Sequence, residues 1–209
     1  MTNLVEKYGW NSDASPQSCG YLAPAVLKQI KALGVSSVLD LGSGNGVLCD
    51  FLAKAGFSMV GVEYDQEGVN VAKERYPSIP FYCLGVQDEP ETVVAEQGHF
   101  DAVVSTEVIE HLFSPHLLPK FAKKVIRPGG YLIVTTPYHG YLKNLALSIF
   151  DGWDKHHTVL WHGGHIKFWS RRTLTTLLQS NGFTVEEFQG VGRFPLLWKS
   201  MMLVARRVA

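Results

Sequence analysis

Acidic and imidazole side chains lie close together in the segment "TEVIEHL", residues 106–112. If this segment is helical, Glu107, Glu110 and His111 share one face, because residues three and four apart are neighbours on a helix. Converging carboxylates and an imidazole can take a proton from a hydroxyl group or hold a divalent cation. Glu110 and His111 are therefore candidate catalytic residues, and the structural alternative is that Glu107 only caps the following helix.

Histidines are concentrated in "DKHHTVLWHGGHIKFW", residues 154–169, which holds four of the chain's eight histidines within ten positions. Structural zinc sites prefer mixed cysteine and histidine ligands, and no cysteine is near, so an all-histidine zinc site is disfavoured. We single out His165 as a second candidate base.

A glycine-rich loop follows an apolar run in "VLDLGSGNG", residues 38–46. A strand that runs into Gly42, Gly44 and Gly46 and then a helix exposes backbone N–H groups on which a ligand can lie. Asp40 precedes this loop and would repel a pyrophosphate, but it could bind an ammonium group. Glu63 follows about 20 residues later, where a carboxylate can accept both ribose hydroxyls.

The spacing of these glycines argues against a nicotinamide dinucleotide. Gly46 comes one residue earlier than the third glycine of the dinucleotide-binding fingerprint. A cofactor that carries an amino acid group fits Asp40 and this spacing better. The structural alternative for Glu63 is a helix-capping acid.

Strands and helices must position these groups, and the hydrophobic pattern predicts both. Short apolar runs typical of strands buried on both faces occupy 36–41, 58–63, 79–84, 100–105 and 131–136. Helical patterns occupy 21–33, 46–56, 66–76, 90–97 and 114–126, the last ending at "RPGG". One helix, 171–181, and two strands, "FTVEEF" and "SMMLVARR", follow. The alternation predicts an α/β fold with a doubly wound, mostly parallel, seven-stranded Rossmann-like sheet in a single domain over 1–209.

Residues 138–170 fall outside this pattern and form a long insertion after the fifth predicted strand. A connection of this length in a compact domain is usually functional, so we predict a lid that folds over residues 106–112 and brings His165 there. Its section 141–153 places leucine, alanine and isoleucine at helical spacing. Such a stripe most often packs on its own domain; left uncovered, it would suit a lipid-like acceptor or a membrane surface.

Composition limits the size of the core, the kinds of partner and the cellular compartment that we predict. The chain has 209 residues, 46% of them hydrophobic, which is enough for one full-sized core. Its 19 basic and 19 acidic residues cancel, so no bulk charge attracts nucleic acid. Three separated cysteines, and no apolar run of the roughly 18–20 residues that span a bilayer, predict a cytoplasmic protein. The oligomeric state is left open.

Four motifs, in order, resemble those of the class I S-adenosylmethionine-dependent methyltransferases: "VLDLGSGNG", "VGVEYD", "FDAVVSTEVIEHL" and "KKVIRPGGYLIVTTP". The resemblance implies S-adenosylmethionine as the cofactor and S-adenosylhomocysteine as its product. It implies a cofactor-binding set made up of Asp40, Gly42, Ser43, Gly44, Gly46, Glu63, Tyr64, Val86 and Glu107. Methyl transfer from a sulfonium is an in-line displacement, for which positioning can supply much of the acceleration.

Two methyltransferase families share the motif after the fourth strand and differ in their acceptors. "HIKFWSRRTL" resembles the ubiquinone-biosynthesis O-methyltransferases, which methylate catechol-type hydroxyls on a polyprenylated ring. Glu107, Glu110, His111 and His165, with Trp169 four residues later, resemble the metal-binding set of the small-RNA 3′-terminal 2′-O-methyltransferases. Both acceptors carry neighbouring hydroxyls, which a metal can chelate and acidify.

We predict an S-adenosylmethionine-dependent methyltransferase that acts on an oxygen of a small or lipid-like hydroxylated acceptor, with His111 or His165 as the base. Metal-assisted methylation of RNA 3′ ends is the second hypothesis, disfavoured because an RNA end would want basic residues beside aromatics. A non-catalytic cofactor-binding protein is the third; a broken glycine loop or missing acids would mark it, and neither is seen. A divalent metal and peripheral membrane contact remain open.

Overall fold

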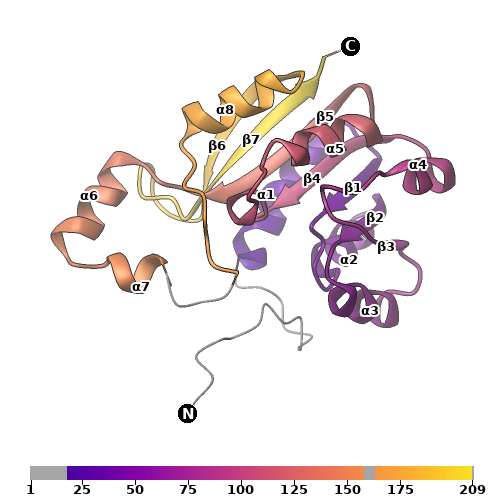
Figure 1. The fold of residues 1–209 in the computed structure, drawn as a ribbon, viewed down its shortest axis with the longest axis horizontal. Helices are drawn as coiled ribbons and strands as arrows, with labels where there is room; N and C mark the ends of the chain where they lie inside the picture. Colours follow the sequence, from indigo (N-terminus) through magenta and orange to yellow (C-terminus); the bar gives the residue numbers. More distant parts are fainter. Residues whose placement is uncertain (1–17, 158–162, 209) are drawn as a thin grey trace.

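The fold is taken from a computed structural model that describes residues 18–157 and 163–208 (Figure 1). Seven strands form one sheet in the order β3-β2-β1-β4-β5-β7-β6. Neighbours from β3 to β5 pair in parallel, and β7 pairs antiparallel with both β5 and β6. The predicted mostly parallel seven-stranded α/β fold is confirmed. The strands are β1 (Ser37–Leu41), β2 (Ser58–Glu63), β3 (Phe81–Cys83), β4 (Phe100–Thr106), β5 (Ile126–Pro137), β6 (Phe183–Val191) and β7 (Ser200–Arg207).

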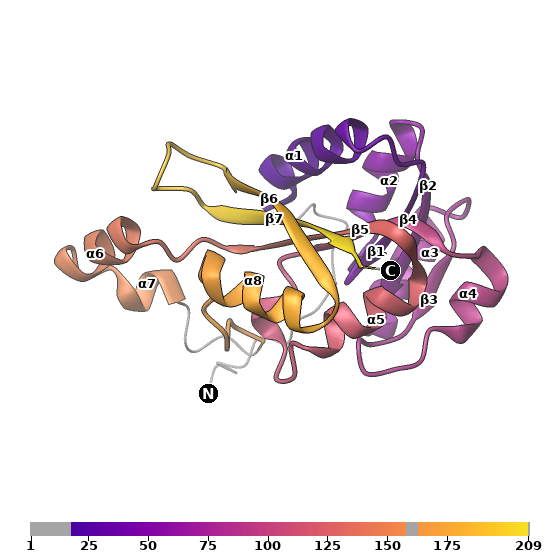
Figure 2. The same ribbon diagram turned by 90° about the horizontal axis from the view of Figure 1, so that it is seen from above.

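Helices cover both faces of the sheet (Figure 2). One face is covered by α1 (Cys19–Ala32), α2 (Val47–Lys54) and α3 (Gln66–Arg75). The other is covered by α4 (Glu91–Gln97), α5 (Leu117–Val125) and α8 (Arg171–Ser180). Successive strand residues point to opposite faces, so Val38 and Leu39 are both buried but belong to different cores. Strands buried on both faces explain the continuous apolar runs in the sequence.

The junction between α5 and β5 differs from the prediction. Helix α5 ends at Val125, and β5 begins at Ile126, so "RPGG" lies in the strand and does not stop the helix. Ile126 pairs with Phe100 of β4, after which the register shifts before Ala102. Gly129 takes a left-handed φ of 75° within this irregular stretch. Pairing with β4 therefore extends β5 back through residues that locally favour a turn.

The insertion after β5 forms an arm, which we define as α6 (Tyr141–Ile149) and α7 (Trp153–His157). Figure 2 shows the arm extending from the end of β5 away from the rest of the domain. No residue of α6 is buried, and Ile149 and Phe150 are 66% and 81% exposed. The apolar stripe predicted for this segment is helical, but the expectation that it packs on the domain is wrong.

The length and hydropathy of a helix decide whether it could cross a membrane. Within the described ranges, the structure contains no helix that is both long enough and apolar enough to cross a bilayer.

Candidate functional site

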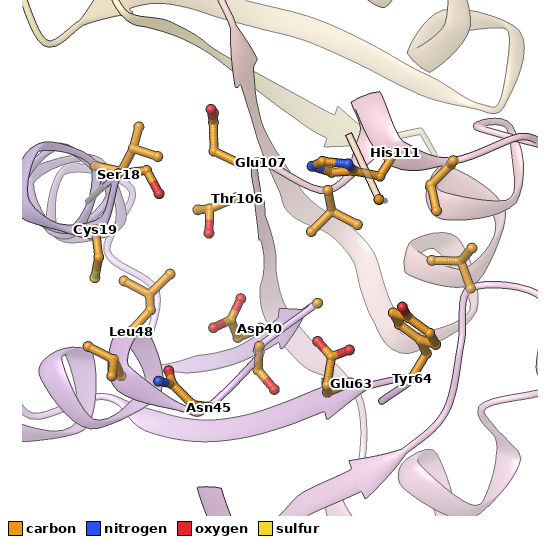
Figure 3. Close-up of a pocket in the computed structure, with 18 of the residues that line it drawn as sticks. Ser18, Cys19, Asp40, Asn45, Leu48, Glu63, Tyr64, Thr106, Glu107 and His111 are labelled. Carbon is orange, nitrogen blue, oxygen red and sulfur yellow. The ribbon is translucent and has the colours of Figure 1, made fainter. Parts of the chain in front are cut away.

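A cavity of about 540 Å³ opens at the carboxyl ends of β1, β2 and β4 (Figure 3). Parallel strands bring their carboxyl ends to one edge, where ligands of open α/β sheets bind. Most residues of the predicted cofactor-binding set line this cavity: Asp40, Gly42, Ser43, Glu63, Tyr64, Val86 and Glu107. Gly44 and Gly46 do not line it but shape the loop beside it.

The glycine loop is held by backbone contacts that a side chain would disturb. Gly42 has a φ of 87°, and a Cβ there would overlap Cγ2 of Val108. The Gly44 N–H donates to Oε2 of Glu63 across 2.9 Å, which ties the loop to the end of β2. Oε1 of Glu63 accepts from the backbone N–H of Asp65. The Glu63 carboxylate is therefore fixed at the cavity by the loop and by the start of α3.

Acidic side chains dominate the charge of the cavity lining. Asp40, Glu63 and Glu107 supply three carboxyl groups, and none of the described lining residues is a lysine or arginine. Burial raises the pKa of Asp40 to about 7. Oδ1 of Asp40 and Oγ of Ser43 are buried without a hydrogen-bond partner in the described structure. Unpaired buried oxygens beside several carboxyl groups favour a ligand that brings N–H donors and positive charge.

The segment after β4 is not the helix that the sequence predicts. Only Ile109–His111 form a helical turn, of the 3₁₀ type, and Glu107 lies before it with a left-handed φ of 56°. Glu107, Glu110 and His111 therefore do not share one helix face. The physical reason is that Glu107 is held by β5: its backbone N–H donates to Thr135, and its Oε1 accepts from the Thr135 hydroxyl at 3.0 Å.

Strand β5 separates the two carboxyl groups. Thr135 binds Glu107, whereas the hydroxyl of Thr136 donates to Oε2 of Glu110 at 3.1 Å. Consecutive strand residues point to opposite faces, so Glu107 lies on the α1 face of the sheet edge and Glu110 on the α8 face. Burial raises the pKa of both, to about 7 for Glu107 and well above the usual range for Glu110, where the Glu107 charge adds to the effect.

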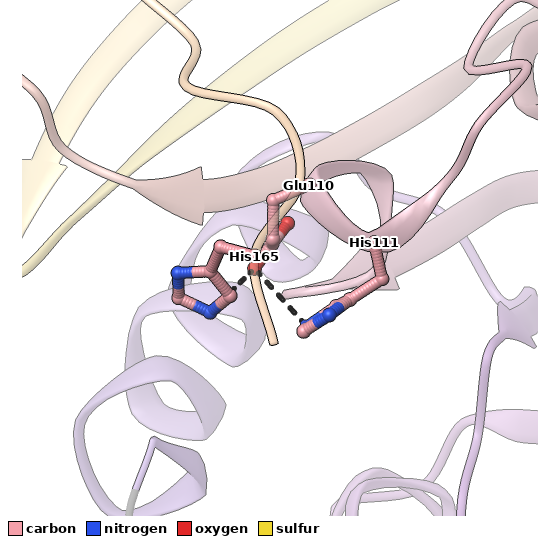
Figure 4. A group of neighbouring side chains, drawn as sticks. All are labelled: Glu110, His111 and His165. Atoms are coloured by element: carbon pink, nitrogen blue, oxygen red, sulfur yellow. Dashed lines mark ion pairs between the residues drawn. The ribbon is translucent and has the colours of Figure 1, made fainter. Parts of the chain in front are cut away.

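On the α8 face, Glu110 meets two imidazoles (Figure 4). Oε1 of Glu110 lies 4.0 Å from Nε2 of His111 and 4.0 Å from Nε2 of His165. This Oε1 atom is buried and has no hydrogen-bond partner in the described structure. One ligand atom from each of the three residues lies within 4.8 Å of the others. Glu107 does not belong to this group, so three of the four predicted metal ligands come together.

Backbone contacts fix the insertion's last section against this group. The N–H groups of Ile166 and Lys167 both donate to the backbone oxygen of Glu110 at 2.9 Å. Nδ1 of His111 lies 3.3 Å from the backbone oxygen of Gly164. A carbonyl oxygen only accepts, so Nδ1 carries the proton in this contact and the neutral ring has no proton on Nε2. Such a contact sets the tautomer of a histidine ligand or base.

Burial favours the neutral form of both imidazoles in this group. Burial lowers the pKa of His111, although backbone contacts with Gly164 and Gly163 oppose the shift. Burial, followed by the neighbouring His111, lowers the pKa of His165 to about 4. Neutral imidazoles can accept a proton or ligate a metal.

A second group of rings, which sequence reasoning missed, joins the arm to the domain. The ring of His139, just beyond β5, lies 5.9 Å from that of His157, and Phe168 contacts both. Trp153 stacks on His157 at 4.7 Å. Both ring nitrogens of His157 are buried without a partner in the described structure. His157 belongs to the histidine-rich segment of the sequence, but nothing in that sequence indicates that it meets His139; His162 of the same segment lies outside the described residues.

Comparison with known proteins agrees with this geometry. A family model described as a methyltransferase domain matches residues 19–187. The ubiquinone biosynthesis O-methyltransferase of Hydrogenovibrio crunogenus is 25% identical over 177 residues, which cover 82% of this chain and 71% of that protein. The mitochondrial ubiquinone biosynthesis O-methyltransferase of Mus musculus is 31% identical over 167 residues, which cover 77% of this chain and 45% of that protein. The chain thus spans less than half of the mitochondrial relative.

Solved structures share the fold. Magnesium protoporphyrin IX methyltransferase from Synechocystis PCC 6803, with bound S-adenosylhomocysteine, superposes with a TM-score of 0.66 at 18% identity. The match covers 89% of this chain and 82% of that one.

Proposed function

This chain belongs to the class I S-adenosylmethionine-dependent methyltransferases, and from that premise we propose that it methylates an oxygen of a small or lipid-like acceptor with neighbouring hydroxyls. The observation that carries the proposal is the gathering of Glu110, His111 and His165 beside the cofactor cavity. The cavity supplies the methyl donor from one face of β5. The acceptor is expected to enter from the other.

The proposed reaction needs one proton acceptor. A lone pair of the acceptor oxygen forms the new bond to the methyl carbon, while the sulfur–carbon bond breaks and its electrons neutralise the sulfonium. The hydroxyl proton passes to Nε2 of His111 or of His165. Both imidazoles are available because burial keeps them neutral. Oε1 of Glu110 lies 4.0 Å from both Nε2 atoms, so the charged form of Glu110 would stabilise the imidazolium that forms.

The same residues fit a divalent cation. Oε1 of Glu110 lacks a partner in the described structure, and one ligand atom each of Glu110, His111 and His165 lies within 4.8 Å of the others. Glu110, His111 and His165 would hold the ion and leave positions open for two acceptor oxygens. A bound cation would lower the pKa of those hydroxyls. Calorimetry decides whether the histidines act as ligands or as bases.

The arm favours a lipid-like acceptor. Large apolar side chains are exposed on it and on the loop between β6 and β7, both of which lie at the same end of the molecule in Figures 1 and 2. These side chains are Tyr141, Leu142, Leu145, Ile149, Phe150 and Trp153 on or beside the arm, and Phe194, Leu196 and Leu197 on the loop. Uncovered apolar patches of this kind mark interaction sites.

The charge at this end of the molecule also favours contact with an anionic membrane. Residues 138–157 and 192–199, which make up the arm with its approach and the loop, hold four basic and two acidic residues, although the charges of the whole chain cancel. A basic, apolar end suits peripheral contact with an anionic membrane, from which a lipid-like acceptor would be taken.

The test combines methyl transfer with calorimetry on His165→Ala, with His116→Ala as the matched control because His116 is exposed and lies outside the cavity. Labelled S-adenosylmethionine is offered with a catechol that carries an isoprenoid tail. Loss of a base or ligand is expected to lower kcat/KM by about 100-fold or more. S-adenosylhomocysteine binding should change less than twofold by the order-of-magnitude expectation for a residue outside a binding cavity.

Two results would contradict the proposal: full activity of His165→Ala, or wild-type protein that methylates no hydroxylated acceptor. Titration with Mg²⁺, Mn²⁺ and Zn²⁺ separates the two roles of the histidines. Binding heat that disappears in His165→Ala assigns them to a metal, and no heat assigns them to proton transfer.

Metal-assisted methylation of RNA 3′ ends is the second candidate. The gathering of Glu110, His111 and His165 favours it, since these residues match the sequence template of that family. An RNA oligonucleotide with a free 2′,3′-diol serves as the acceptor in the same assay. Metal-dependent methylation of the RNA, with none of the catechol, would replace the first candidate by the second.

A further inference from the structure

Rings connect α7 with the domain, toward which this helix turns back from α6 (Figures 1 and 2). His139 lies just beyond β5, and His156 and His157 belong to α7. We call these three residues the histidine cluster. Their ring centroids are 4.9 Å apart for His156 and His157, 5.9 Å for His139 and His157, and 6.3 Å for His139 and His156. Phe168, from the segment before α8, packs edge-on against His139 and His157. Ionisable rings thus occupy the place where the arm meets the domain.

His157 is enclosed by the other rings of this place. Only 9% of its surface is exposed. The Trp153 ring stacks on it at 4.7 Å, and the His139 ring lies nearly parallel to it, with an interplanar angle of 18°. Its Nδ1 and Nε2 atoms are both buried and have no hydrogen-bond partner within the described ranges. A protonated His157 would therefore leave a charge and two N–H donors unsatisfied in this position.

The main charges that act on the histidine cluster are positive. Lys143 of α6 acts on all three imidazoles, and Arg193 of the β6–β7 loop acts on His156. His165, in the segment before α8, acts on His139 when it is protonated. The three imidazoles are also close enough to repel one another once they are charged. Every charged neighbour named here therefore opposes protonation of the cluster.

Carboxyl groups do not offset these positive charges by direct contact. Among the described residues, no carboxylate forms an ion pair with a nitrogen of the histidine cluster. The two acidic residues of the arm and its turn, Asp151 and Asp154, are exposed. Lys143 is held near the cluster, because its Nζ donates to the backbone oxygen of Tyr138 at 2.9 Å. The closed arrangement thus suits neutral imidazoles and not imidazolium ions.

The direction of the pH effect follows from these surroundings. Burial, followed by the Lys143 charge, lowers the pKa of His139 and of His156 to about 4, and the same two causes lower the pKa of His157. In a released arm the rings would return to the ordinary imidazole pKa of about 6.5. The released arm therefore binds protons more tightly. The closed arm has its full stability above about pH 6.5 and loses stability as the pH falls toward about 4.

We propose that His139, His156 and His157 form a pH-sensitive latch, which holds α7 on the domain while the imidazoles are neutral and releases it when they gain protons. The inference concerns the arm alone and does not rest on the proposed acceptor. Its test uses neither acceptor nor cofactor, so its failure is distinguishable from failure of the proposed function.

The test follows amide hydrogen exchange of the full chain by mass spectrometry at pH 7.5 and pH 5.0, corrected for the effect of pH on the intrinsic exchange rate. Helix α7 has five residues, and isolated helices shorter than about 12 residues are marginal in water. The protection of its amides therefore depends on the contacts with the domain. In the wild type, protection of residues 153–157 should fall about tenfold or more at pH 5.0. The amides of β5 should stay protected at both pH values.

Two substitutions of His157 separate charge from packing. His157→Phe keeps a ring in the stack but cannot gain a proton, so α7 should lose much less protection at pH 5.0 than in the wild type. His157→Lys places a cation there and should expose α7 to exchange already at pH 7.5. His139→Phe repeats the first comparison from the domain side of the cluster. The control His99→Phe changes an exposed histidine in the turn before β4 and should behave like the wild type.

Three results would overturn the latch. The first is equal protection of α7 in the wild type at both pH values. The second is a loss of protection in His157→Phe and His139→Phe as large as in the wild type. The third is a loss of β5 protection together with that of α7 at pH 5.0, because acid would then unfold the domain and not release the arm.

Discussion

At the scale of single residues, the cavity depends on places where a side chain is absent. Gly42 ends the first strand with a left-handed φ and leaves the space that Val108 occupies. Gly56 has a similar φ of 97°, but a Cβ there would meet nothing within 4 Å. Both glycines have a left-handed φ, but their surroundings differ. Substituting each of them therefore separates the free-energy cost of the left-handed backbone from the free-energy cost of filling the cavity wall.

Gly42→Ala and Gly56→Ala form a matched pair. Both should lose about 1–2 kcal/mol of unfolding free energy, because alanine pays for a left-handed backbone. Gly42→Ala should lose a further 1–3 kcal/mol, the typical order of magnitude for overpacking against Val108. It should also weaken S-adenosylhomocysteine binding, whereas Gly56→Ala should not. Urea denaturation and calorimetry measure both effects, and equal losses in the two variants would contradict the assignment.

At the scale of elements, one carboxylate holds the starts of β1 and β4 together. Oδ2 of Asp101 accepts from the backbone N–H groups of Ser36 and Ser37 and from the Ser36 hydroxyl, and Oδ1 lies 2.7 Å from Nε of Arg127. Burial raises the pKa of Asp101, but these hydrogen bonds and the Arg127 charge outweigh it and lower the pKa to about 2. The contact lies at the opposite end of the two strands from the cavity.

Asp101→Asn should lower the unfolding free energy by about 1–2 kcal/mol at neutral pH, a value reduced for the solvent exposure of Arg127. A pKa lowered in the folded state adds stability above the unfolded pKa of about 4, and this stability is lost as the pH falls toward 2. The difference in unfolding free energy between wild type and variant should therefore have its full size above pH 4 and be almost gone at pH 2. A difference that is independent of pH would contradict the carboxylate's role, and S-adenosylhomocysteine binding should be unchanged.

Regular elements could be predicted from the sequence because their signals are local. The run 58–63 is a strand with the predicted bounds, and so is Ser200–Arg207. The 3₁₀ turn could not be predicted, because Thr135 of a distant strand fixes Glu107 before a helix can begin. The contact between the hydroxyls of Tyr21 and Ser200 could not be predicted for the same reason: neither residue belongs to a local motif, and 179 residues separate them. The meeting of His165 with Glu110 was predicted from strand order, since β4 and β5 are neighbours.

At the scale of the whole molecule, the charges and apolar surface are distributed unevenly. The arm and the β6–β7 loop place exposed apolar side chains at one end, beside the face on which Glu110 lies. The cofactor cavity opens nearer the glycine loop. An acceptor held in a lipid surface would thus reach the transferred methyl group while the cofactor exchanges with solvent.

Ile149→Asp and Phe150→Asp, at 66% and 81% exposure, should abolish co-sedimentation with vesicles of anionic phospholipid and leave the unfolding free energy within about 0.5 kcal/mol of wild type. The control Val208→Asp changes an exposed apolar residue outside the arm and the loop and should bind vesicles normally. Methylation of a catechol without an isoprenoid tail should persist in the arm variants. Vesicle binding that survives both aspartates would contradict a membrane-facing arm.

Thr135 and Thr136 have a consequence for how this sequence tolerates insertions and deletions. One residue inserted into β5 before Thr135 and Thr136 would move each hydroxyl to the opposite face of the sheet. Neither hydroxyl would then lie on the same face as the carboxyl group to which it now donates. Lengthening the arm after Pro137 leaves that parity untouched. Insertions and deletions can thus accumulate in the arm, while the strand before it accepts substitutions but keeps its length.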